Sequence, residues 1–298
     1  MLWIILSVLI AVLKSLSELT GKIFTKENKE NTHIDEFSLA LWGRYFALLC
    51  LLPSIYFIEF QWLSLPMFWV LIAASLFNSI GSITTLKAVK YGDLSLVWPL
   101  SSLTIPFLLI TGFVIAGELP NIYWLLWVML IFIGTYFLQI SKSRAWLLGP
   151  IKALFADTWA KYMLITSLLW SLTTPLDKLW IVEYWVFQWM LYSNLLMCIM
   201  TTLYALQYKR ESFTHIREVK SIKKISLLTL IWWWALIIQM FALKLTLAVY
   251  VISIKRASWI FSVIFWALFF KEKNIIQKLI AVSIMLIGVG IISIWGNI

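Results

Sequence analysis

Long apolar runs separated by short polar linkers constrain the fold of this chain more than any other feature of its sequence. Ten stretches are long enough, at about 20 residues, to cross the roughly 30 Å hydrocarbon core of a bilayer as helices. They cover residues 2–24, 37–58, 66–87, 94–116, 121–140, 160–182, 185–207, 226–247, 249–270 and 275–295. Because 62% of the residues are apolar and only 13% are charged, one water-soluble core cannot bury this surface. The sequence therefore predicts an all-α integral membrane protein.

The rest of the composition excludes several classes of protein. The net charge of +10 comes mainly from basic residues between the apolar runs, where they contact anionic head groups, so we expect no nucleic-acid partner. Cys50 and Cys198 lie within apolar runs, which argues against a disulfide framework. The two histidines, His33 and His215, lie in polar linkers, so the chain offers no ligand cluster for zinc or haem, and we expect no cofactor.

Segments far apart in the chain carry related patterns at nearly constant offsets. Shifted by 156 positions, LKSLSELTGKIF at 13–24 falls on LWSLTTPLDKLW at 169–180, which pairs Lys22 with Lys178. A shift of 154 positions places AVKYGDL at 88–94 on ALKLTLA at 242–248, and AGELPN at 116–121 on FKEKNI at 270–275. The shared order of these matches indicates an internal repeat.

Each copy of this repeat holds five apolar runs, and an odd number of crossings inverts the second copy in the membrane. We therefore expect ten transmembrane helices arranged as two inverted five-helix repeats, at 1–145 and 160–298, with a linker at 146–159. Inverted repeats of this kind form secondary transporters, whose substrate sites lie near the midplane between the halves.

Two of these segments also resemble a known family. The segment YGDLSLVWPLSSLTIPFLLITGFVIAGELPN at 91–121 resembles the fourth-helix signature of EamA-like members of the drug/metabolite transporter superfamily. The segment VYVISIKRASWIFSVIFWALFFKEKN at 249–274 resembles the ninth-helix signature, and Arg44 resembles an arginine often found at the opening of the second helix. The resemblance implies a ten-helix carrier of small metabolites in the cell membrane, typically a bacterial inner membrane, coupled to protons or to exchange. The glycine that usually precedes the glutamate is Gly117 in the first half, but Lys271 replaces it in the second.

Charged residues inside the first apolar run are the first candidates for a site. Lys14, Glu18 and Lys22 recur every four residues and so share one face of a helix. A charge at the centre of a membrane helix costs about 2.5–3.5 kcal/mol on insertion scales, so such residues normally face the bundle interior or a water path. Two interpretations stay open: Lys14 and Glu18 form an internal ion pair, or Glu18 faces a cavity, where it exchanges protons or meets a substrate amine. Lys22 and Lys178, near helix ends, are interpreted as anchors that reach the head groups.

Two adjacent cations in the ninth run form the second candidate. Lys255 and Arg256 lie about two turns into the expected helix and favour a substrate with a carboxylate or phosphate group. The alternative is that they pair with Glu18 or with a helix C-terminus.

Uncharged side chains complete the predicted substrate site. Asn78 in the third run and Ser171 in the sixth belong to polar faces that either pack helices together or line a cavity. Trp98, Trp170 and Trp259 are candidates for aromatic contacts with the substrate.

These features predict a secondary active transporter for a small polar or amphipathic metabolite, such as an amino acid or another carboxylate- or phosphate-bearing compound. Transport would proceed by alternating access, either with or without proton coupling. A flippase for lipid-linked sugars is the alternative. An integral membrane enzyme acting on lipid is a weaker one, because no nucleophile–base set occurs and Asp157 and Asp177 are interpreted as isolated interfacial acids.

Orientation and oligomeric state stay open in the sequence. The basic linkers place both termini outside, whereas the family resemblance places both in the cytoplasm. We expect a monomer or a homodimer in the lipid bilayer. Its expected partner is a small-molecule substrate, either with or without protons. No ATP-binding loop of the G-x-x-x-x-G-K-[ST] kind is present in the sequence.

Overall fold

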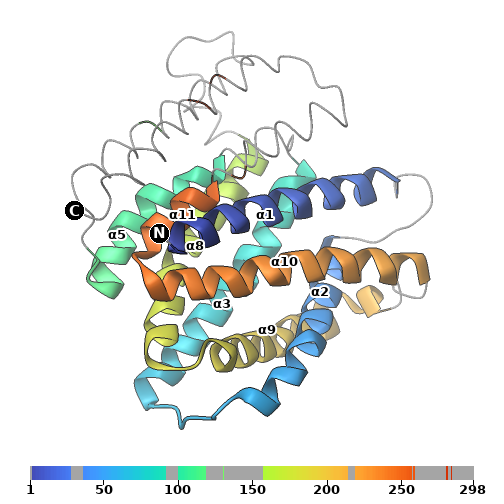
Figure 1. The fold of residues 1–298 in the computed structure, drawn as a ribbon. Coiled ribbons are helices and arrows are strands. Elements are labelled where there is room, and N and C mark those ends of the chain that lie inside the picture. Colours follow the sequence, from blue (N-terminus) through green and yellow to red (C-terminus); the bar gives the residue numbers. More distant parts are fainter. Residues whose placement is uncertain are drawn as a thin grey trace.

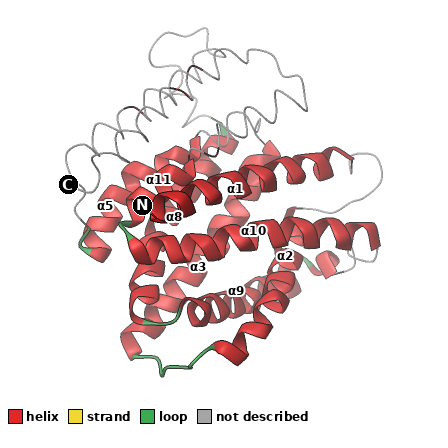
Figure 2. Ribbon diagram, viewed as in Figure 1, coloured by secondary structure: helices red, strands yellow, loops and turns green. Residues whose placement is uncertain are grey.

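The computed structural model describes residues 2–27, 36–91, 100–118, 157–213 and 219–256, with the single positions 130, 258, 280 and 283. All regular structure in these ranges is helical, and they contain no strand (Figure 2). The α-helices are α1 (Leu2–Glu27), α2 (Glu36–Leu51), α3 (Leu65–Tyr91), α5 (Thr104–Ala116), α8 (Thr158–Glu183), α9 (Val186–Tyr208), α10 (Val219–Leu245) and α11 (Ala248–Arg256). Short 3-10 helices occupy Leu52–Phe57, Ser101–Leu103 and Arg210–Phe213.

These helices follow the predicted apolar runs wherever the structure describes them. Turns separate α8 from α9 at residues 184–185 and α10 from α11 at residues 246–247, so the eighth and ninth runs do not fuse. The runs 121–140 and 275–295 and most of 249–270 lie outside the described residues. An all-helical fold is therefore confirmed for the described residues, and the number of ten transmembrane helices stays a prediction.

Within the described ranges, three helical stretches are both long and apolar enough to cross a bilayer: Leu65–Ala88, Val186–Tyr208 and Ser226–Leu245. Shorter apolar helical stretches cover Leu2–Ser17, Ala40–Tyr56 and Thr104–Ala116. Large apolar side chains face outward along these helices; examples are Leu2, Ile5, Val8 and Leu9 of α1 and Ile110, Phe113 and Val114 of α5. An apolar exterior over a helical bundle is what a lipid solvent requires, and it supports a membrane protein.

The major helix contacts join segments from the two ends of the chain. Helix α3 packs against α8 and α9, α1 packs against α10 and α11, α5 packs against α8, and α2 packs against α9 and α10. Figure 1 shows α1 and α10 lying side by side, with the beginning of α1 close to α11. Trp3 of α1 stacks on Tyr250 of α11, with 5.8 Å between the ring centroids. The described residues on the two sides of the gap between 118 and 157 therefore form one interlocked bundle.

Local sequence explains how the ends of α5 and the middle of α8 are built. Gly117 ends α5 in the left-handed conformation (φ 65°), and the N–H of Glu118 then bonds to the carbonyl of Gly112 at 3.1 Å. Pro175 lies inside α8, where its missing N–H leaves the carbonyl of Ser171 without a partner in the helix. The Thr111 hydroxyl of α5 donates to that carbonyl at 2.7 Å, so a side chain of the neighbouring helix supplies the missing hydrogen bond.

Candidate functional site

The first predicted site residue that the structure describes fully is Lys14. It lies twelve residues into α1, and its Nζ lies 5.9 Å from the centroid of the Trp170 ring in α8. Gly81 of α3 lies against the same ring, since a Cβ added to Gly81 would come within 3.2 Å of Trp170 Nε1. Lys14 is therefore directed into the bundle, toward a helix of the second half of the chain. Glu18 lies one turn further along α1, and its side chain lies outside the described part of the structure.

Hydroxyl groups join α3 to α8 at the level of this contact. Thr84 of α3 and Thr166 of α8 share a hydrogen bond of 2.7 Å between their hydroxyl oxygens. Ser171 is fully buried, and its hydroxyl donates to the carbonyl of Leu168 within α8 at 2.6 Å. Asn78 is half-buried in α3, where its backbone carbonyl accepts a hydrogen bond from Ser82. Among these residues, Ser171 has the geometry of the packing interpretation rather than of a cavity wall.

The second predicted cation, Lys255, lies seven residues into α11 and bonds through Nζ to the side-chain oxygen of Gln239 in α10. Asp177 of α8 is buried, at 7% exposure, and Lys255 is a positive charge in its surroundings. The interpretation of Asp177 as an interfacial acid is therefore wrong. The adjacent cation Arg256 and the aromatic candidates Trp98 and Trp259 lie, as side chains, outside the described part.

Sequence reasoning missed Gln239, to which Lys255 bonds, and the buried acid Asp177, which has Lys255 in its surroundings. Asp177 lies seven residues after Trp170 and therefore on the same face of α8, about 10 Å further along the axis. That spacing was a usable signal, because Trp170 was already a candidate. Gln239 is an isolated amide within an apolar run, and only the packing of α10 against α11 identifies its partner.

Arg44 is a further interior cation, which the sequence singled out only by family resemblance. It lies eight residues into α2, and its Nη2 donates to the Ser82 hydroxyl of α3 at 2.7 Å. Its guanidinium carbon lies 5.6 Å from the centroid of the Trp232 ring in α10. Asn194 of α9 donates to the backbone carbonyl of Arg44 at 3.3 Å, which fixes this part of α2 against α9.

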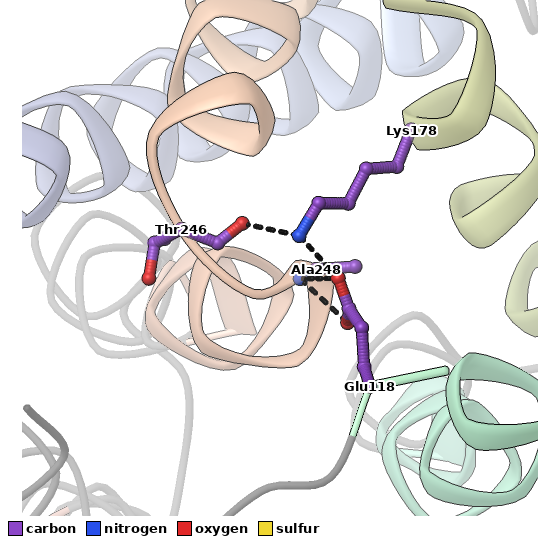
Figure 3. A network of polar contacts seen from close by, with 4 residues as sticks. All are labelled: Glu118, Lys178, Thr246 and Ala248. Atoms are coloured by element: carbon purple, nitrogen blue, oxygen red, sulfur yellow. Dashed lines mark hydrogen bonds and ion pairs between the residues drawn. The ribbon is translucent and has the colours of Figure 1, made fainter. Parts of the chain in front are cut away.

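A polar network ties α5 to the turn between α10 and α11 (Figure 3). Both carboxylate oxygens of Glu118 accept from the N–H of Ala248, at 3.3 and 3.0 Å, and so cap the beginning of α11. Lys178 of α8 forms an ion pair with Glu118 and donates to the carbonyl of Thr246 at 2.8 Å. The prediction that Lys178 anchors to head groups is therefore wrong, because its ammonium points inward to two partners. The same prediction for Lys22, that it reaches the head groups, concerns a side chain outside the described part of the structure.

Two further hydrogen bonds join the loop before α3 to the α8–α9 turn and the beginning of α9. The Gln188 amide of α9 donates to the carbonyl of Gln61 at 2.8 Å, and the N–H of Ser64 donates to the Tyr184 hydroxyl at 3.2 Å. A pocket of about 410 Å³ opens there, lined by Gln61, Glu183, Tyr184, Trp185, Val186, Phe187, Phe241 and Lys244. None of the predicted site residues lines this pocket, so we do not assign the substrate to it.

Comparisons with known proteins identify the architecture and nothing finer. No known protein family and no curated protein matches this chain. A solved structure titled "Crystal structure of protein" is similar over 99% of this chain and 96% of its own, with a TM-score of 0.63 and 12% sequence identity. The fold is thus shared with a solved structure. At this identity the likeness concerns the fold alone, and the site must be argued from its own residues.

Proposed function

We propose that this chain is a secondary active transporter for a small metabolite that carries a carboxylate or phosphate group. The observation that supports the proposal is the contact of Lys14 with Trp170, because it directs a cation of one apolar helix into the bundle, toward a helix from the other half of the chain. A charge at such depth is costly unless it faces protein or water, and it commonly marks a substrate or ion pathway. Lys255, with Gln239 and Asp177, adds a second interior cation.

The pattern of helix contacts supports two inverted repeats as the transport unit. In the sequence alignment, α1 corresponds to α8 and the end of α3 corresponds to the end of α10. The contact of α3 with α8 is then the counterpart of the contact of α10 with α1. By the same alignment, α11 corresponds to residues 94–102, so the contact of the 3-10 helix Ser101–Leu103 with α8 has its counterpart in the contact of α11 with α1. Reciprocal packing of this kind is expected of halves that rock against each other around a central site.

The network around Glu118 is suited to close one face of such a carrier. It joins α5 of the first half to α8 and to the α10–α11 turn of the second half (Figure 3). Opening that face would require Glu118 to separate from these partners or to move with them. A carboxylate buried inside the bundle, such as Asp177 with Lys255 in its surroundings, would supply the group that proton coupling needs.

Flux through purified protein in liposomes tests the proposal. Counterflow would be measured across labelled carboxylates, phosphate esters, amino acids and lipid-linked sugars, and then repeated with Lys14→Met and Lys255→Met. We expect uptake of an anionic metabolite that both variants lose, while Lys161→Met, an exposed lysine near the beginning of α8, keeps it. Counterflow of lipid-linked sugar alone would favour the flippase. Undiminished flux in both interior variants would reject this site.

A further inference from the structure

We infer that Arg44 is an oxyanion-binding residue of this chain, and that its ligand is a carboxylate or phosphate attached to an apolar body. The inference rests on the proposed function and names the group that would hold the charged end of the substrate. Arg44 belongs to α2, near the middle of a helix whose neighbours are α3, α9 and α10. Its contacts to α3 and α10 place its guanidinium within the bundle.

The charge of Arg44 is not neutralised by any acid that the structure describes. The ion pair between Lys178 and Glu118 is formed elsewhere, and Arg44 has no carboxylate partner in the described ranges. Its polar side-chain contact there is the single bond from Nη2 to Ser82. Leaving a guanidinium uncompensated at membrane depth is unfavourable, and an anionic ligand would remove that cost.

The remaining donors of Arg44 are open to a ligand. A guanidinium carries five N–H donors in a planar fork that matches the two oxygens of a carboxylate or phosphate. Within the described residues, none of the Arg44 nitrogens is a fully buried atom without a hydrogen-bond partner, and the residue as a whole is half-buried. The N–H groups that make no bond therefore keep some accessible surface within a largely buried environment.

Ser82 and Trp232 hold the fork in one orientation. The Ser82 hydroxyl donates to the carbonyl of Asn78 at 2.7 Å, so its lone pairs stay directed toward Arg44. The ring of Trp232 lies against the guanidinium and restricts its rotation. A fork fixed in this way loses less entropy when it binds an oxyanion.

The surroundings of Arg44 also indicate the rest of the ligand. Gly81, the residue next to Ser82 on α3, contacts Trp170, so Arg44 and the Lys14–Trp170 contact border adjacent positions of one helix. Two indole rings, Trp170 and Trp232, therefore lie at the level of the two cations. A ligand with an oxyanion at one end and an apolar or aromatic body fits these groups.

Protection of Arg44 from an arginine reagent tests the inference on the intact, detergent-solubilised chain. Phenylglyoxal would be added with phenylacetate, with phenyl phosphate, or with neutral phenylacetamide, and modified arginines located by mass spectrometry. We expect one or both anions at saturation to slow modification of Arg44 roughly fivefold or more, by mass action, while the amide does not. The exposed Arg210 is the internal control and should react equally in all samples.

Ligand-induced thermal stabilisation gives a second readout. The rise in melting temperature with the protecting anion should vanish in Arg44→Gln, shrink in Arg44→Lys, which keeps the charge without the fork, and persist in Arg210→Gln. The inference is overturned if Arg44 is unreactive, or if it reacts equally with and without both anions. Since neither readout needs transport, protection without liposome flux would leave the anion site standing and reject the carrier. Flux that depends on Lys14 while no anion protects Arg44 would support the carrier and reject the anion site at Arg44.

Discussion

Lys14 and Trp170 occupy equivalent positions of the two aligned segments, 156 residues apart, and the structure brings them together with 5.9 Å between Nζ and the ring centroid. The pair marks a place where side chains of α1 and α8 meet inside the bundle. It also shows how an apolar helix tolerates a lysine, because the side chain is directed toward protein and not toward lipid.

Gly81 should be required where it contacts Trp170. Gly81→Ala needs the indole to move by a few tenths of an ångström, since the new Cβ would lie 3.2 Å from Nε1. Helix entropy favours alanine by about 0.5–1 kcal/mol, so the two effects should nearly cancel in thermal unfolding. Gly81→Val should overpack the site, lower stability by about 1–3 kcal/mol and reduce any flux that depends on Lys14.

Gly43 provides the matched control for that series. Its nearest added contact is Thr229 Oγ1 at 3.6 Å, an ordinary van der Waals distance. Gly43→Ala should therefore raise the melting temperature in detergent. If Gly81→Val were as stable as Gly43→Val, the close approach of Gly81 to Trp170 would not exist.

Gly117 should be required for its backbone conformation alone. Its φ of 65° disfavours a side chain, and no atom lies within 4 Å of an added Cβ. Gly117→Ala should lower stability by about 1–2 kcal/mol, the cost of a left-handed residue with a Cβ. Gly112→Ala is the control, because its new Cβ meets Glu118 Oε2 at 3.7 Å without strain. Equal melting temperatures for the two variants would contradict this account.

The ion pair of Glu118 and Lys178 should contribute to stability as a unit. Lys178 is 16% exposed and Glu118 is 5% exposed as side chains, so removing one partner leaves the other charge largely buried. Glu118→Gln and Lys178→Met should each cost up to about 3–5 kcal/mol. The double variant should cost less than the sum, although the cap on Ala248 stays weakened in it. Thermal unfolding of the four proteins measures this coupling, and strictly additive losses would exclude it.

Asp177 and Lys255 allow the same comparison inside the bundle. Asp177→Asn leaves Lys255 without its nearby negative charge, and Lys255→Met removes the positive charge from Asp177. We expect each single variant to melt below the neutral double variant, because uncompensated charge at this depth is costly. Glu183→Gln, an exposed acid at the end of α8, is the control and should melt as the parent does. A double variant less stable than both single variants would show that the two residues do not interact.

The sequence by itself determined the class of fold and the positions of its charges along the helices. Runs of about 20 apolar residues dictate membrane helices, because backbone polar groups in lipid must be satisfied within the helix. Spacing then placed Lys14 and Lys255 within the runs, and each lies at that position in its helix.

Only the tertiary structure decided which side chains meet. Lys178 turns inward to Glu118, sixty positions away in the chain, and Asp177 is buried inside the bundle with Lys255 in its surroundings. Helices that are apolar on nearly every side give little signal about which face is inward, so rotation and partner are set by the neighbouring helices. The position of a residue along its helix is encoded by the local sequence. The partner of its side chain depends on how distant segments of the chain pack together.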